Sequence, residues 1–197
     1  MPQEPTPALD NEAANTTAAK PEPPALTSYM GRLEDSIHRT LALLEMAKHL
    51  ENRSAAQDII RATVVLNHAY LEDLLRTLAE LALPESGEAV LKEIPLAGSR
   101  GRLERFHLGK LAQFRGDTVD SLIRRSVSEL LDRSNFNNVD EIARLLELLG
   151  LDPADYREEF PILGAMISRR HQIVHKGDRQ PSESTPAEID AFEALMW

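Results

Sequence analysis

Residues 167–178, ISRRHQIVHKGD, hold the densest group of chemically useful side chains in this chain of 197 residues. Two arginines, two histidines, a lysine and an aspartate fall within a stretch that otherwise has the apolar pattern of a helix. Histidine exchanges protons near neutral pH, and the planar fork of arginine binds two phosphate oxygens at once. These residue types together could transfer protons beside a phosphate, so this stretch is the first candidate for a functional site.

Spacing of about 100° per residue around a helix separates the polar residues of this stretch. Arg170 falls near the middle of an apolar stripe, where an arginine rarely belongs without a partner; the stripe consists of Leu163, Met166, Ile167, Ile173 and Val174. His171 and His175 lie one turn apart on the flank of this stripe, whereas Arg169 and Gln172 face away from it. The pattern therefore predicts an outward Arg169 and an inward Arg170.

Three interpretations fit these residues. In the first, Arg170 pairs with a core carboxylate such as Glu72, and both histidines are surface residues that the helix dipole favours near a C-terminus. In the second, His171 and His175 bind a metal ion as a pair four residues apart. That site lacks the glutamate of the metalloprotease motif, since Gln172 stands there, and no third ligand is evident nearby. In the third, His175 transfers protons and Arg170 binds phosphate.

The segments that must position these residues are predicted to be helices. Residues 29–50 carry an apolar stripe with Thr27 or Ser28 as cap; the stripe consists of Met30, Leu33, Ile37, Leu41 and Leu44. Residues 54–84 form a second long helix, which a capping box of Ser54 and Gln57 opens and Pro84 closes. Two long helices with a short link favour an antiparallel hairpin, and the sequence shows no strand alternation. The fold class is therefore predicted to be all-α.

The middle of the chain is broken into shorter pieces by Gly, Pro and Asn. Residues 118–132 are predicted to form one helix and residues 138–150 another, with Asn138 and Glu141 as a capping pair and Gly150 as the stop. Pro161 suits the first turn of the motif helix, which Gly177 ends. A last helix is predicted to start at residues 185–188, and we expect it to be cut short at Trp197.

Composition limits the remaining choices. With 42% hydrophobic residues the chain can build one ordinary core. The formal net charge of −10 argues against general attraction to nucleic acid, so any such contact has to be local. Cysteine is absent, which excludes disulfides and thiolate metal sites, and no run approaches the roughly 18 apolar residues of a membrane span. We therefore expect a soluble, cytoplasmic protein without membrane contacts.

Residues 1–25 hold half of the 12 prolines of the chain and no aromatic or β-branched apolar residue. Such a segment cannot bury enough apolar area to offset the entropy lost on ordering. We therefore expect a disordered tail over residues 1–25 and a single helical domain over residues 26–197.

Several segments carry a family resemblance. Arg170 and His175, which enclose four residues in RRHQIVH, are similar to the signature of the HEPN domain, and more closely to its RiboL-PSP-HEPN branch. The segment LNHAYLEDLLR resembles the second-helix pattern of this branch, FHLGKLAQFRGDTVDSLI its following insertion, and RSNFNNVDEIARLLELLGLD the segment before the motif helix. The order of these segments is more specific than the short Arg-His motif alone.

The resemblance implies an up-and-down helical bundle of HEPN type, with a short-helix insertion between the second helix and the motif helix. It also implies a homodimer in which two motif helices meet across a two-fold cleft. Active members of the family are metal-independent endoribonucleases that need no cofactor. They often serve as toxins or antiphage effectors, and they often have an antitoxin partner.

Carried onto this sequence, the resemblance gives His175 the role of general base toward a ribose 2′-hydroxyl of an RNA substrate. Arg170 would stabilise charge on the phosphate, and His171 would orient the substrate or the partner motif. Glu72 and Asn67 on the second helix are supporting candidates, since Glu72 could orient Arg170 and Asn67 could cap a buried group. Many family members are inactive, so the alternative is a non-catalytic helical module that binds RNA or protein.

Overall fold

The computed structural model describes residues 24–99 and 108–176. All its elements are helical: α1 Pro24–Lys48, α2 Arg53–Ala82, η1 Leu83–Glu85, α3 Glu88–Leu91, η2 Leu108–Phe114, α4 Val119–Arg133, α5 Val139–Leu148, η3 Pro153–Tyr156 and α6 Phe160–Lys176. No strand occurs within these residues, which confirms the predicted all-α bundle with its insertion of short helices. Residues 1–23 of the predicted tail, which was expected over residues 1–25, and the predicted last helix lie outside the described residues.

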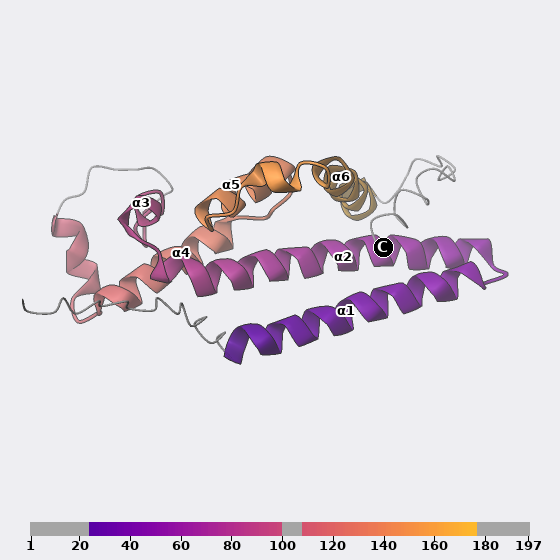
Figure 1. Cartoon of the computed structure of the whole chain (residues 1–197), viewed down its shortest axis with the longest axis horizontal. Helices are drawn as coiled ribbons and strands as arrows, with labels where there is room; N and C mark the ends of the chain where they lie inside the picture. The colour runs from indigo at the N-terminus through magenta and orange to yellow at the C-terminus, as the bar shows by residue number, and fades with distance from the viewer. Residues whose placement is uncertain (1–23, 100–107, 177–197) are drawn as a thin grey trace, which may run out of the picture.

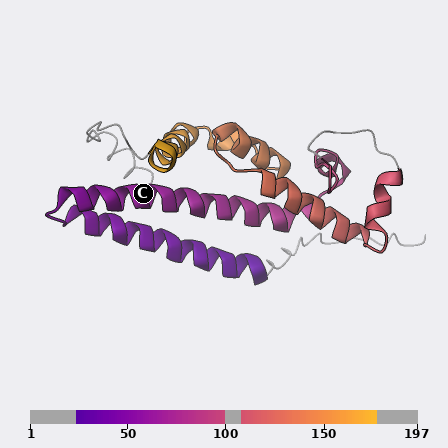
Figure 2. The same ribbon diagram turned by 180° about the vertical axis from the view of Figure 1, so that it is seen from behind.

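The two long helices α1 and α2 form the expected antiparallel hairpin. Helices α5 and α6 lie on the side of α2 that is opposite to α1, and α6 is seen nearly end-on where it crosses α2 (Figures 1 and 2). Helix α4 lies near the C-terminal end of α2. None of the described helices is long and apolar enough to cross a membrane.

Both long helices begin at residues other than the predicted ones. Helix α1 starts at Pro24, so Thr27 and Ser28 lie inside it and do not cap it. Proline suits a first helical turn because its φ is already helical and its missing N–H is not needed there. Helix α2 is capped by Asn52, whose Oδ1 accepts hydrogen bonds from the backbone N–H groups of Ser54 at 3.0 Å and Ala55 at 3.2 Å. Asparagine is one of the strongest N-caps, and it replaces the predicted capping box.

The buried face of α1 is also different from the predicted one. It consists of Tyr29, Ser36, Thr40 and Ala47. The predicted stripe lies on the flank of this face, where Met30 keeps 48% and Ile37 44% of its surface exposed. Because α1 packs mainly against α2, one face of α1 suffices to cover its contact and the wider stripe stays partly open.

Hydroxyl groups make the contact between α1 and α2 possible. Ser36 donates to the carbonyl of Arg32 and Thr40 to that of Ser36, each at 2.8 Å, and Thr63 on α2 donates to the carbonyl of Ile59 at 2.9 Å. Each hydroxyl is therefore satisfied within its own helix before the two helices meet, which removes most of the cost of burying it. Small side chains at these positions let the two backbones approach closely.

The starts of α4 and α5 and the end of α5 follow the sequence prediction. Thr118 accepts a hydrogen bond from the backbone N–H of Ser121 at 3.1 Å and opens α4. Asn138 does the same for Glu141 at 2.8 Å and opens α5. Gly150, with a φ of 78°, ends α5 in the left-handed conformation that glycine adopts readily.

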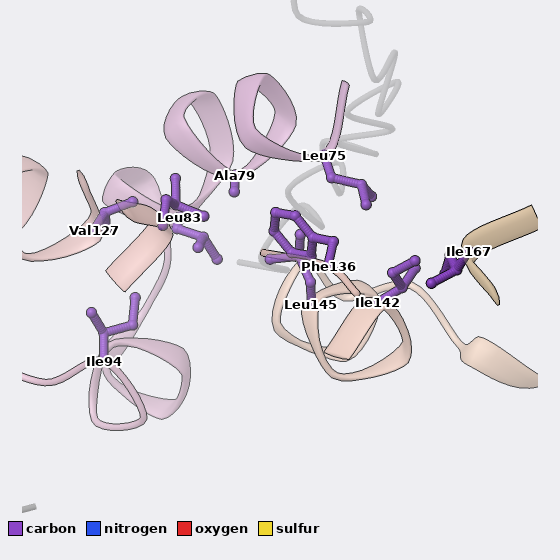
Figure 3. Packing of buried hydrophobic residues seen from close by; sticks show 10 residues of the cluster. Leu75, Ala79, Leu83, Ile94, Val127, Phe136, Ile142, Leu145 and Ile167 are labelled. Atoms are coloured by element: carbon purple, nitrogen blue, oxygen red, sulfur yellow. The ribbon is translucent and has the colours of Figure 1, made fainter. Parts of the chain in front are cut away.

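The core joins α2 to the insertion and to α6. Its buried members are shown in Figure 3: Leu75, Ala79, Leu83, Ile94, Val127, Leu131, Phe136, Ile142, Leu145 and Ile167. Phe136 is 2% exposed although its backbone has a φ of 45°, which is unusual for a bulky residue. Arg76 on α2 holds this segment, since its guanidinium donates to the carbonyls of Leu131 and Ser134 and lies 5.5 Å from the Phe136 ring centroid. The chain that leads into α5 is thereby fixed to α2.

Candidate functional site

Helix α6 positions the Arg-His motif. The helix starts at Phe160, with Pro161 in its first turn as predicted. Met166 and Ile167 are buried and anchor the middle of α6, which packs against α2 and α5. Towards the C-terminal end this cover is lost, and Val174 keeps 48% of its surface exposed. The motif residues therefore lie where a buried helix emerges at the surface.

The motif side chains face different environments on this helix. Arg170 is half-buried, whereas His171 and His175 are exposed, with their ring centroids 4.6 Å apart and their planes tilted by 45°. Arg169, predicted to face outward, is half-buried and donates to the side-chain oxygen of Gln172 at 3.4 Å. Arg170 and His175 are five residues apart, which places them about 140° apart around the helix axis. One copy of α6 therefore presents them in different directions.

Arg170 forms no hydrogen bond and no ion pair with any residue in the ranges 24–99 and 108–176. Its expected partner Glu72, with 25% of its side chain exposed, instead places Oε2 3.6 Å from Nδ1 of His68, one turn earlier on α2. Asn67, the other supporting candidate, is half-buried on α2. The cation of the motif is thus left available for another partner.

His68 is the residue that sequence reasoning passed over. Its side chain is 1% exposed, and its buried Nε2 finds no hydrogen-bond partner among the described residues. Burial lowers the pKa of the imidazole and the positive charge of Arg170 on α6 adds to this effect, whereas the Glu72 carboxylate and a backbone hydrogen bond with Phe136 partly offset it. The sequence held one signal, since His68 stands on the apolar stripe of α2 four residues before a glutamate.

Comparison with known proteins identifies the family of this chain. Residues 34–194 match the sequence profile of RiboL-PSP-HEPN. The chain belongs to the RiboL-PSP-HEPN family. The match includes α2 with Glu72 and His68 as well as α6 with its Arg-His motif, so both helices that carry the candidate residues lie within the matched region. No curated protein and no solved structure gave a match.

Charge in this RiboL-PSP-HEPN chain is distributed unevenly. The whole chain carries a formal net charge of −10, yet residues 160–176 contain no Asp or Glu and include two arginines, two histidines and a lysine. A local cationic surface can attract a phosphate even where the whole protein repels it, because screening limits the repulsion of distant charges to about 8–10 Å. The motif helix α6 therefore has a positive formal charge in a chain whose formal net charge is negative.

Metal ligation was the second interpretation of the two histidines. Within the part of the chain that the structure describes, no three His, Asp or Glu side chains form a group that could hold a metal ion. His171 and His175 lie close to each other, but neither gains a third ligand from a neighbouring described element.

Proposed function

We propose that this protein is a metal-independent endoribonuclease. The observation that carries the proposal is that α6 presents an exposed His175 five residues after Arg170, and that Arg170 has no carboxylate partner among the described residues. In addition, α6 contains no acidic residue. Arg170 in a purely structural role would be expected to hold a fixed ion pair. Membership of the RiboL-PSP-HEPN family supports the same conclusion.

In the proposed reaction the Nε2 or Nδ1 atom of His175 takes the proton of a ribose 2′-hydroxyl. The 2′-oxygen then attacks the adjacent phosphorus, and the bond from phosphorus to the 5′-oxygen breaks. Arg170 stabilises the negative charge that develops on the non-bridging phosphate oxygens, because its fork binds two of them at once. His171, one turn from His175, orients the RNA, and solvent supplies the proton that the departing 5′-oxygen takes up.

The decisive test is cleavage by the intact chain in the presence of a chelator. We expect RNA to be cut to products with 2′,3′-cyclic phosphate and 5′-hydroxyl ends, and the same sequence as DNA to remain intact because it lacks the nucleophile. Cleavage that requires an added divalent metal, or that proceeds equally on DNA, would contradict the mechanism. RNA binding without cleavage would support the alternative of a non-catalytic module.

A two-fold dimer through α6 is part of the proposal. Arg170 and His175 are presented about 140° apart on one helix, so a second copy of α6 could bring a complementary Arg-His pair to one cleft. The exposed Val174 offers an apolar surface for this contact beside the histidines. An inhibitory partner protein such as an antitoxin would act most simply by covering the same surface.

We therefore expect the full-length chain to be a dimer at micromolar concentration and Val174→Asp to shift it to a monomer, because a charge in an apolar contact must be desolvated. Multi-angle light scattering measures the mass directly. Met30→Asp is the matched control, since Met30 on α1 is also 48% exposed but lies away from α6. A monomeric wild type at high micromolar concentration, or equal dissociation by both variants, would argue against this dimer.

A further inference from the structure

The rings of His171 and His175 form a close pair on α6. Their centroids lie 4.6 Å apart with the planes tilted by 45°, and both side chains are exposed. Neither ring forms a hydrogen bond or an ion pair with another of the described residues. By contrast, Nε2 of His49 lies 2.9 Å from Glu45 Oε1, and His68 is buried on α2. Two neighbouring proton-transfer groups are therefore not engaged by the described fold.

The proposed cleavage involves two proton transfers at one phosphorus. The attacking 2′-oxygen loses a proton and the departing 5′-oxygen gains one, and an in-line displacement places these oxygens on opposite sides of the phosphorus. A proton-transfer group has to come within about 2.6–3.2 Å of the oxygen that it serves. The two nitrogens of one imidazole point away from each other, so a single ring faces only one of these oxygens. The departing oxygen is left to solvent unless a second group lies beside the first.

We infer that His171 is a second catalytic residue, a general acid that protonates the departing 5′-oxygen while His175 takes the proton of the 2′-hydroxyl. This inference rests on the proposed function, and it replaces solvent as the source of that proton. Residues four apart lie about 40° apart around a helix, so both rings face one side of α6. Because the rings are in contact within one chain, both come from the same protomer, whichever copy supplies Arg170.

The protons balance over one turnover. Neutral His175 gains the proton of the 2′-hydroxyl, the bond from the 2′-oxygen to phosphorus forms, and the bond from phosphorus to the 5′-oxygen breaks. Protonated His171 gives its proton to the 5′-oxygen, which departs as a hydroxyl. Both rings are exposed and imidazole exchanges protons near neutral pH, so exchange with solvent restores the starting forms.

The charges beside the pair suit a phosphate. A neighbouring carboxylate would hold an imidazole in a fixed contact, but α6 contains no Asp or Glu. No described carboxylate forms an ion pair with either ring. The residues that precede His171 are Arg169 and Arg170, two cations that attract phosphate oxygens. The helix therefore brings a phosphate toward the two rings without tying up either of them.

A substrate with sulfur in place of the bridging 5′-oxygen separates a general acid from a residue that only orients RNA. A thiolate departs without being protonated, because thiols are much stronger acids than alcohols. On ordinary RNA we expect His171→Ala and His171→Gln to lower kcat by about two to four orders of magnitude. On the sulfur substrate we expect both variants to stay within about tenfold of wild type, whereas His175→Ala stays slow on both substrates.

Two comparisons make this test specific. His171→Gln keeps hydrogen-bond donors at the position but cannot transfer a proton, so it would rescue an orienting residue and not a general acid. His38→Ala removes an exposed histidine of α1 and is the matched control, which should cleave both substrates as wild type does. All rates are measured in chelator together with the thermal midpoint, which should stay near that of wild type because His171 is exposed.

The outcomes separate this inference from the proposed function. An equal loss on both substrates, full activity of His171→Ala on ordinary RNA, or recovery of activity in His171→Gln would overturn the role of general acid. Each of these results leaves the proposed function intact if wild type cleaves RNA and His175→Ala does not. A wild type that cleaves neither substrate would end the proposed function and this inference together.

Discussion

His175→Ala is expected to lower the rate of RNA cleavage by about two to four orders of magnitude, the usual effect of removing a general base. The fold should be preserved because His175 is exposed at the end of α6 and forms no core contact. The ring of His171 is its near neighbour, at 4.6 Å between centroids, and it remains in this variant. Single-turnover cleavage and the thermal midpoint, both measured in chelator, check this expectation.

His49→Ala provides the control. His49 is an exposed histidine just beyond the end of α1, where its Nε2 lies 2.9 Å from Glu45 Oε1, far along the chain from the motif. Its removal should affect neither cleavage nor folding appreciably. Equal cleavage by wild type and His175→Ala would end the proposal that His175 is the base, and it would favour the interpretation of both motif histidines as surface residues.

Arg170→Lys is expected to lower cleavage by about 100- to 1000-fold although the positive charge is kept. Lysine presents a point charge on a flexible stem and cannot bind two phosphate oxygens in one plane. The measurement is kcat and KM with RNA, together with the unfolding midpoint of each protein.

Arg169→Lys is the matched control for this variant, since the neighbouring arginine is half-buried and donates to Gln172 on the same helix. We expect it to retain most of the cleavage rate. A structural role for Arg170 predicts a different order of effects: Arg170 variants would lower the unfolding midpoint strongly, and His175→Ala would change little. Loss of folding in Arg170→Lys, with unchanged activity per folded molecule, would support that alternative.

In the second half of the chain, features that depend on local chemistry were predictable from the sequence, whereas the predicted caps of α1 and α2 were wrong. Thr118, Asn138 and Gly150 begin or end their helices as expected, because a cap requires only the backbone of the next few residues. Pro161 lies in the first turn of α6 for the same reason. The order of these helices, together with the family resemblance, was sufficient to predict the fold class.

Features that depend on a distant partner were not predictable. Hydrophobicity alone placed the stripe of Met30 and Ile37 inside, whereas the structure buries Ser36 and Thr40, whose hydroxyls are satisfied within α1. Sequence spacing cannot show that α2 offers a matching surface for small side chains. The predicted face of α1 was therefore wrong although the helix itself was correct.

The same limit applies to the candidate site. Arg170 was expected to turn inward, but its neighbour His68 stands about a hundred residues earlier, and no local pattern links the two. Only the spacing of His68 and Glu72 on α2 gave a hint, and an isolated histidine on an apolar face is ordinarily a core residue. Only the packing of α6 against α2 brings the two helices together.

The distance along the chain between α2 and α6 also determines when the site can exist. The α1–α2 hairpin has local contacts and can form as soon as it is synthesised, but α6 reaches α2 only after residues 83–159 have been added between them. The candidate residues on α2 are therefore synthesised, and can fold, before those on α6 emerge from the ribosome. Under the proposed function, this order keeps the nascent chain inactive toward the RNA of the ribosome that synthesises it.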